Sequence, residues 1–383
     1  MRPAPRPRVL LVRGHQTNSW HLRPWRHLTD RYDVAVAQTR RNWFDTTSVG
    51  LEAREARALR DLLPPGRVGD VLSRIPGDRY VSPRRLFGGS DIVHSQDLGF
   101  WYSMQAAKYK QELGYKLVLT VWETIPFLDA YRNVRTRPYR RRVLAATDLF
   151  LATTERARAA LLLEGAPAER IEVVPPGVDD ELFKAPNSTE PPPNEHTVIS
   201  AGRLVWEKGH QDVLRAVAAL RQRAVSGLPA SVPVPRVIVV GAGPEEGRLR
   251  RYARELGVDD LLDLRKEVPY AEMPRLYASA SCLVLASLPV WSWEEQFGMV
   301  LAEAVSAGLG IIAAASGAIP EVLGSRAPSF PPGDWTELAR LLVSGPLSRA
   351  PGARVDYDNE ARATYSGRRF AERLGSAYDR VLG

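Results

Sequence analysis

Short apolar runs alternate along the whole chain with longer segments whose apolar residues recur at helical spacing. Several runs are almost continuously apolar, which is typical of strands buried on both faces of a parallel sheet. The segments between them, such as Gln211–Arg223 and Glu246–Leu256, predict helices. This repeated alternation predicts an α/β protein with doubly wound sheets. The predicted strands are Val9–Val12, Asp33–Ala37, Ile92–His94, Lys116–Val121, Leu149–Ala152, Ile171–Val174, Val198–Ala201, Val237–Val240, Leu261–Leu264, Cys282–Ala286 and Gly310–Ala314.

The length of 383 residues exceeds one ordinary domain and suits two. A proline-rich stretch, Pro186–Pro193, prevents regular structure and predicts a linker within Lys184–Asn194. We therefore expect one domain over residues 1–184, a second over 195–365, and a final helix over 366–383. An apolar stripe on that helix must pack against something; it consists of Phe370, Leu374, Tyr378 and Val381.

The composition, 44% hydrophobic and 25% charged, is that of a globular protein. No apolar stretch reaches the roughly 18 residues of a membrane-spanning helix. The apolar run near the N-terminus, Val9–Val12, is too short for a secretory signal, so we expect a cytoplasmic location. The single cysteine, Cys282, excludes a disulfide framework and a cysteine-based zinc site.

The net charge of +8 lies in the N-terminal half. Residues 1–180 hold 29 Lys+Arg and 20 Asp+Glu, whereas the remainder holds 23 and 24. The densest segment, Arg132–Arg142, has six arginines in eleven residues. It is either a solvated basic surface or a contact with an anionic acceptor or anionic lipid, which would place the protein at the inner membrane face.

The first candidate motif follows a predicted strand that ends at Ala201. Gly202 permits a tight turn, and Arg203 and Lys208 precede the next helix. Ligands of open α/β sheets bind beyond the carboxyl ends of strands, where two cations beside a helix N-terminus suit a diphosphate. The alternative is a surface loop with two solvated cations.

The second candidate motif contains Glu295 and Glu303. We expect Glu295 in a loop and a helix that begins near Gly298, so that the amides of Met299 and Val300 face an anion. Each carboxylate suits the hydroxyls of a sugar. The alternatives are compensation of the helix dipole for Glu295 and an exposed helical position for Glu303.

These segments together resemble family 4 glycosyltransferases of the GT-B fold. The resemblance is strong over residues 149–323 and weaker before them. Its segments are Val174–Asp179, Gly202–Gly209, Ala280–Ser287, the Glu295/Glu303 pair and Gly317–Val322.

The resemblance implies two Rossmann-like domains that face a cleft, with the C-terminal helix crossing back to the N-domain. The C-terminal domain would bind a nucleoside-diphosphate-sugar and the N-terminal domain a hydroxyl acceptor, whether a glycan, a glycolipid or a small metabolite. The implied activity is that of a hexosyltransferase of EC class 2.4 that retains the anomeric configuration. No resident cofactor and no nucleic-acid partner are expected.

The resemblance also implies residue roles. Arg203 and Lys208 would neutralise the diphosphate leaving group. Glu303 would hold the ribose and Glu295 the donor sugar. The remaining substrate-binding positions that it implies are Phe297, Gly298, Met299 and Val300 at the phosphate and sugar, Val268 near the base, and Gly14 where the N-domain backbone approaches the phosphates.

The first half departs from the family at one position. Many relatives carry a histidine after the fourth N-domain strand, but here Lys116–Val121 runs into Trp122 and Glu123. We expect Glu123 to be a catalytic polar group of the cleft, with a buried ion pair or a helix cap as the alternative. His94 is the other candidate for a substrate contact, with a structural histidine as the alternative.

We expect no metal site. The one Asp-x-Asp match, Asp356-Tyr-Asp358, lies in a polar stretch and is interpreted as surface. Arg203 and Lys208 would supply the positive charge that a cation supplies in other transferases.

Two other functions are compatible with parts of the sequence. A GT-B-like sugar phosphorylase or epimerase is one, although a phosphorylase needs pyridoxal phosphate on a lysine and no recognisable cofactor motif is present. A non-enzymatic binder of membrane surfaces or nucleic acid is the other, and it predicts salt-dependent binding to polyanions.

Overall fold

The computed structural model describes residues 5–64, 77–128, 137–184, 193–229, 231–266 and 268–383. They form two compact units. The first comprises Met1–Val178 with Gly367–Gly383, and the second comprises Asp179–Ser366. Within the described ranges, no helix combines the length and the apolar character needed to cross a membrane.

The first unit is built on a seven-stranded sheet whose strand order is β3-β2-β1-β4-β5-β6-β7, and every pairing is parallel. Its strands are β1 (Arg8–Val12), β2 (Asp33–Gln38), β3 (Glu52–Glu55), β4 (Ile92–Gln96), β5 (Lys116–Val121), β6 (Leu149–Ala152) and β7 (Ile171–Val173). Its main helices are α1 (Ser19–Leu22), α3 (Pro83–Phe87), α4 (Trp101–Leu113), α6 (Arg137–Ala146), α7 (Glu155–Leu163) and α16 (Gly367–Leu382).

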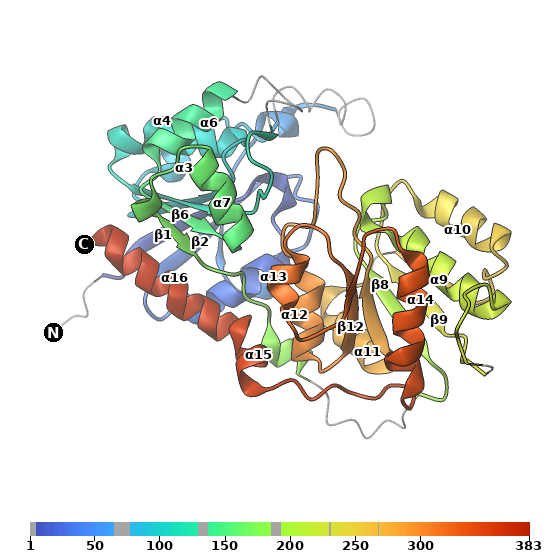
Figure 1. The fold of residues 1–383 in the computed structure, drawn as a ribbon. Coiled ribbons are helices and arrows are strands. Elements are labelled where there is room, and N and C mark those ends of the chain that lie inside the picture. The colour runs from blue at the N-terminus through green and yellow to red at the C-terminus, as the bar shows by residue number, and fades with distance from the viewer. Residues whose placement is uncertain (1–4, 65–76, 129–136, 185–192, 230, 267) are drawn as a thin grey trace. The chain divides into compact units, whose positions relative to one another are not determined.

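Both faces of this sheet are buried. Alternate strand residues such as Leu10 and Leu119 pack with α4, α6 and α7 on one face. Those of the other phase, such as Leu11, pack with the 3-10 helix η2 (Arg23–Leu28) and with α16. The apolar stripe of α16 supplies Leu374 and Tyr378 to this second core, and Figure 1 shows α16, in red, beside the first unit's strands.

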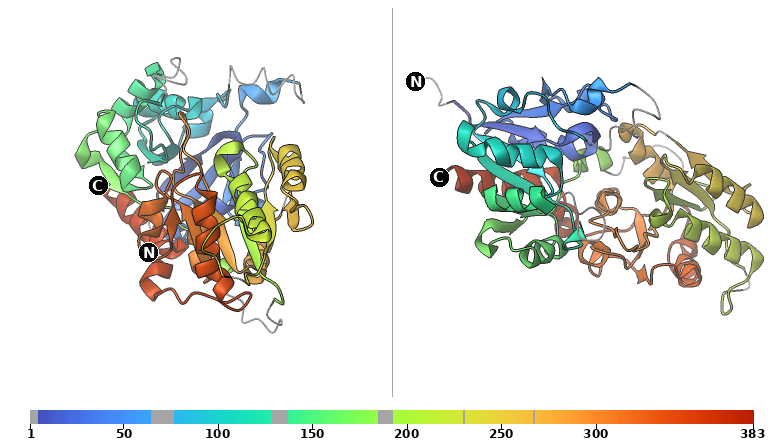
Figure 2. Two further views of the ribbon diagram at one scale, coloured as in Figure 1. Left: turned by 45° about the vertical axis from the view of Figure 1, so that its right-hand side comes forward. Right: turned by 90° about the horizontal axis from the view of Figure 1, so that it is seen from above.

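The second unit has a six-stranded parallel sheet of order β10-β9-β8-β11-β12-β13. Helices α9, α10 and α14 cover one face, whereas α11 and α12 contact strands from the other (Figure 2). The strands are β8 (Thr197–Ala201), β9 (Arg236–Val240), β10 (Leu262–Arg265), β11 (Cys282–Leu285), β12 (Gly310–Ala314) and β13 (Ser329–Phe330). The helices are α8 (Asp180–Phe183), α9 (His210–Gln222), α10 (Glu246–Glu255), α11 (Met273–Ser279), α12 (Met299–Ser306), α13 (Ile319–Leu323), α14 (Trp335–Ser344) and α15 (Asn359–Thr364).

The predicted fold class is confirmed, including the final helix that returns to the first unit. Two strands, β3 and β13, were not predicted from the sequence. Residues 179–184 lie with the second unit, because the ring of Phe183 packs against Tyr270 and Tyr277. Residues 185–192 of the predicted linker and 132–136 of the basic segment lie outside the described residues.

Candidate functional site

The strands β8 and β11 are neighbours in the second sheet although they are not consecutive in the chain. Ligands of open α/β sheets bind beyond the carboxyl ends of strands at such a switch in strand order. The loop after β8 carries Arg203 and Lys208, and the loop after β11 carries Ser287 and Glu295. The topology therefore brings the two sequence motifs to one edge of the sheet.

Gly209 allows these two loops to touch. It adopts a left-handed conformation with φ of 68°, and a Cβ atom on it would lie 1.8 Å from the carbonyl oxygen of Ala286. The amide of Leu288 donates to the carbonyl of Glu207 at 2.8 Å and ties the loops together. Any side chain at position 209 would force the turn that carries Lys208 away from β11.

Lys208 and Glu295 form a buried ion pair. The ammonium nitrogen of Lys208 donates to Oε2 and Oε1 of Glu295 at 2.7 and 3.1 Å, and the hydroxyl of Ser287 donates to the same Oε2 at 2.6 Å. The Lys208 and Glu295 side chains are only 14% and 7% exposed. The ammonium also lies 4.7 Å from the ring centre of Trp293. A ligand that binds either charge must therefore change the hydrogen bonding of the other.

The backbone of Glu295 is anchored by the segment that follows β12. The amide of Ala318 donates to the Glu295 carbonyl at 2.8 Å. At Gly317, with φ of 54°, a Cβ atom would lie 2.1 Å from that same carbonyl oxygen. The Gly317–Val322 segment thus fixes the position of Glu295, which gives this part of the family resemblance a physical reason.

Glu303 is buried in α12, at 3% exposure, and is held by two tyrosines. The hydroxyl of Tyr270 donates to Oε1 at 3.0 Å and that of Tyr277 to Oε2 at 2.9 Å. Burial raises the pKa of Glu303 from 4.5 to about 7, against the lowering effect of the two hydrogen bonds. The exposed-helix alternative for Glu303 is therefore excluded.

The helix α12 begins at Met299, with Gly298 as its N-cap in a left-handed conformation. The first amides of a helix have no acceptor within it, so those of Met299 and Val300 are available to an anion. The neighbouring Phe297 is 2% exposed, and its ring packs edge-on against Tyr365 at 5.3 Å. A ligand would therefore meet the backbone of Phe297 and not its ring.

The remaining predicted residues of the second unit lie around this edge. Arg203 has a side chain 62% exposed, 4.0 Å from Glu207. Its carbonyl contacts Nε2 of the buried His210 at 3.1 Å, and Nδ1 of His210 contacts the Ser200 hydroxyl at 2.8 Å. Val268 lies beyond the end of β10 and is half-buried.

In the first unit, Gly14 follows β1 with φ of 65°, and a Cβ atom on it would lie 2.3 Å from the carboxylate of Asp78. The internal packing thus already requires a glycine there. His94 is 1% exposed and uses both ring nitrogens inside the protein, with the hydroxyls of Tyr378 and Thr120, each at 2.6 Å. This geometry favours the structural alternative for His94.

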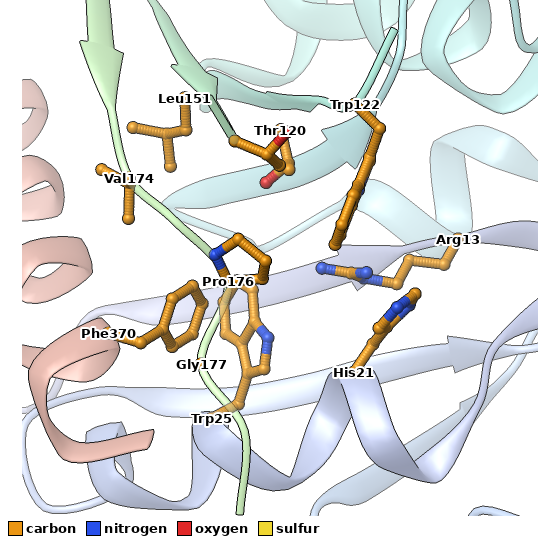
Figure 3. Close-up of a pocket in the computed structure, with 11 residues that line it drawn as sticks. Arg13, His21, Trp25, Thr120, Trp122, Leu151, Val174, Pro176, Gly177 and Phe370 are labelled. Atoms are coloured by element: carbon orange, nitrogen blue, oxygen red, sulfur yellow. The ribbon is translucent and has the colours of Figure 1, made fainter. Parts of the chain in front are cut away.

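Glu123 lies in the loop after β5, and burial raises its pKa. Its Oε1 accepts from the amides of Thr124 and Ile125 at 3.0 and 2.9 Å, so the carboxylate caps its own loop. Thr120 and Trp122, on either side of the strand end, instead line a pocket at the carboxyl edge of the first sheet (Figure 3).

The described residues contain no group of three or more His, Cys, Asp or Glu side chains placed to hold a metal ion. Asp356 is fully exposed near Arg362, and Asp358 caps the N-terminus of α15.

Sequence reasoning missed four residues that organise the site: Ser287, Tyr270, Tyr277 and His210. Ser287 directly follows the predicted strand Cys282–Ala286 and was therefore within reach of the switch-point argument. The tyrosines lie more than 25 positions from Glu303, and no local pattern links them to it.

Two family models match the chain. One, described as Glycosyl transferases group 1, matches residues 183–350, and the other, Glycosyltransferase Family 4, matches residues 25–182. Together with the two parallel sheets, they place the chain in the GT-B structural class. The chain belongs to glycosyltransferase family 4, as its sequence motifs predicted.

Individual relatives agree with this assignment. The D-inositol 3-phosphate glycosyltransferase of Mycobacterium tuberculosis (strain ATCC 25618 / H37Rv) is 28% identical over 326 residues, covering 77% of this chain and 63% of the relative. The match thus spans less than two thirds of that relative's length. The structure of Anabaena Alr3699/HepE in complex with UDP aligns with 98% of this chain and 100% of its own, with a TM-score of 0.71 and 16% identity. Sucrose-phosphate synthase (tll1590) from Thermosynechococcus elongatus has the same TM-score at 17% identity, covering 98% of this chain and 99% of its own. Both likenesses concern the fold.

Proposed function

We propose that the protein transfers a hexose-type sugar from a nucleoside-diphosphate-sugar to a hydroxyl acceptor, with retention of the anomeric configuration. The observation that carries this proposal is the buried Lys208–Glu295 pair at the β8/β11 switch point, with Glu303 buried in the adjoining helix. Family membership supports it. So do the fold relatives solved with UDP and with UDP-glucose, and the relative named for transfer to an inositol phosphate.

The second unit holds the donor in this proposal. The cations of Lys208 and Arg203, with the amides of Met299 and Val300, neutralise the diphosphate as it leaves. This positive charge lies where a metal ion acts in other transferases, so the reaction needs no added metal. Glu295 accepts from the hydroxyls of the transferred sugar.

Glu303 accepts from the ribose hydroxyls. Its carboxylate is already desolvated and oriented by two tyrosines, so binding the ribose requires little reorganisation. The first unit binds the acceptor. The exposed arginines of α6, Arg137, Arg141 and Arg142, support a contact with an anionic surface.

Calorimetry on two matched variants tests these roles. Glu303→Gln weakens binding of the free nucleoside diphosphate, because the ribose is present in product and donor alike. Glu295→Gln does not weaken that affinity, because it frees the Lys208 ammonium from its ion pair for the diphosphate. It lowers turnover of the intact donor, because only the donor carries the sugar. The titration is run at about pH 8, above the pKa of about 7 of Glu303, so that its carboxylate is ionised. A charged hydrogen bond contributes about 1.5–3 kcal/mol, so each effect is about 10- to 150-fold. Equal loss of nucleoside diphosphate binding in both variants would show that the roles are assigned wrongly.

A further inference from the structure

A pocket in the first unit opens at the carboxyl edge of the sheet, next to the switch point between β1 and β4. The pocket is small and partly open to solvent, so it suits one compact group of a larger ligand. Figure 3 shows Arg13, His21 and Trp122 on one side and Trp25 and Pro176 facing them. Neither the family resemblance nor the comparisons assign a role to Arg13, His21 or Trp25.

Arg13 is a buried cation that has no carboxylate partner among the residues that the structure describes. It is only 7% exposed. Within the described ranges, its one hydrogen bond is a long contact of 3.5 Å to Oε1 of Gln96, and its guanidinium lies 5.7 Å from the Trp25 ring centre. Burial lowers the pKa of Arg13 accordingly. A buried charge is costly unless it is paired, so the fold keeps this guanidinium at the expense of stability.

No acid in the described segments forms an ion pair with this guanidinium. Asp97 acts on Arg13 only through longer-range electrostatics, and its carboxylate already accepts from the amide of Trp122 at 2.8 Å. Burial raises the pKa of Asp97 to about 7, so it is only partly ionised at neutral pH. The guanidinium thus remains the one full charge among the described side chains that line the pocket.

His21 contributes a donor and no charge. Burial, with a smaller effect of Arg13, lowers the pKa of His21 to about 3, so the ring is neutral. Asn18 accepts from the His21 amide at 2.9 Å through Oδ1, so its Nδ2 faces Nδ1 of the ring at 3.3 Å as a donor. The ring proton of His21 must then lie on Nε2.

Trp25 adds a further donor. Its indole Nε1 is buried and has no hydrogen-bond partner in the part of the chain that the structure describes. A buried donor that is left unpaired destabilises the fold. The pocket thus gathers a guanidinium, an indole N–H and an imidazole N–H, all of which donate. Such a set is complementary to an oxyanion.

We propose that this pocket binds an oxyanion of the acceptor, a phosphate ester or a carboxylate, through Arg13, Trp25 and His21. The assignment to the acceptor rests on the proposed function, in which the first unit binds the acceptor. The protein would then select anionic acceptors and discriminate against neutral sugars.

Calorimetric titration of the full chain with inorganic phosphate, acetate and glycerol tests the proposal. Wild-type protein binds phosphate or acetate and not glycerol. A preference for phosphate indicates a phosphate ester, and a preference for acetate a carboxylate. Arg13→Gln lowers the affinity at least tenfold, as expected for loss of a charge-assisted contact, and Trp25→Phe lowers it by about 3- to 10-fold. Arg85→Gln, which removes an exposed arginine, leaves it unchanged.

Thermal unfolding shows whether a variant that fails to bind phosphate is still folded. Because Arg13→Gln removes an uncompensated buried charge, it melts no lower than the wild type, and the anion raises the melting temperature of the wild type alone. If Arg13→Gln does unfold, Arg13→Lys is the alternative variant. It keeps the charge but loses the planar guanidinium that can donate two parallel hydrogen bonds, so it should bind phosphate more weakly than the wild type.

Three outcomes separate this proposal from the proposed function. Phosphate binding that is unchanged in Arg13→Gln, or that disappears in Lys208→Ala instead, overturns the pocket assignment and leaves sugar transfer intact. Loss of phosphate binding in Arg13→Gln, with nucleoside diphosphate affinity retained, supports both. Phosphate binding that depends on Arg13 in a protein without nucleotide-sugar affinity supports the oxyanion site and contradicts the proposed function.

Discussion

Replacing Glu303 by glutamine should stabilise the second unit at neutral and alkaline pH. The wild-type carboxyl has a pKa of about 7 in the folded protein against 4.5 for an unperturbed group. The folded state therefore binds the proton more tightly than the unfolded state does. Proton binding to Glu303 therefore stabilises the folded protein fully below about pH 4.5, and this stabilisation is lost as the pH rises through about 7.

The difference between these pKa values gives the size of the effect. A pKa difference of about 2.5, at about 1.36 kcal/mol for each pKa unit, corresponds to about 3 kcal/mol. The free energy of unfolding of the wild type falls by this amount between about pH 5 and about pH 8. Glutamine has nearly the same shape and no charge, and its amide can bond both Tyr270 and Tyr277. The free energy of unfolding of the variant should lack this part of the pH dependence.

Equilibrium urea unfolding of both proteins across this range provides the assay. The difference between the two curves cancels every other titrating group, including Asp97. Glu255→Gln, which changes an exposed glutamate of the same unit, is the matched control and should parallel the wild type. A constant difference between wild type and Glu303→Gln at all pH values would refute the claim that burial has raised this pKa.

Two further predictions concern catalysis. Lys208→Ala or Arg203→Ala should slow transfer by raising its activation free energy by about 2–4 kcal/mol, because each removes a donor to the leaving diphosphate. The circular dichroism spectrum of each variant should remain that of the wild type. Wild-type turnover in both variants would contradict their assignment. Transfer should also persist in EDTA, because these two cations supply the positive charge; loss of activity that Mg²⁺ or Mn²⁺ restores would show that they do not suffice.

The sequence predicted the buried strands well because their apolar runs are nearly continuous. The runs Lys116–Val121, Leu149–Ala152 and Gly310–Ala314 are strands with those same bounds. The strand β3, Glu52–Glu55, was not predicted, because three of its four residues are charged and it pairs only with β2 at the sheet edge. The strand β13 has two residues, too few for any periodicity.

The candidate site was predictable only as far as single loops. Spacing placed Lys208 and Glu295 at strand ends, but their pairing depends on Gly209 and Gly317, whose close contacts are tertiary. The lack of a carboxylate partner for Arg13 among the described residues could likewise not be predicted from the sequence. An arginine after a buried strand does not by itself reveal whether an acidic side chain faces it.

The most direct test of the proposed activity is nuclear magnetic resonance of the reaction product. Purified protein is incubated with a panel of UDP-, GDP- and ADP-sugars and with sugar-phosphate and sugar-acid acceptors, beside Lys208→Ala. The proposed function predicts that the wild type alone releases a nucleoside diphosphate and forms a glycosidic bond with the donor's anomeric configuration. An inverted product would contradict retention, and consumption of no nucleotide-sugar at all would contradict the proposed sugar transfer.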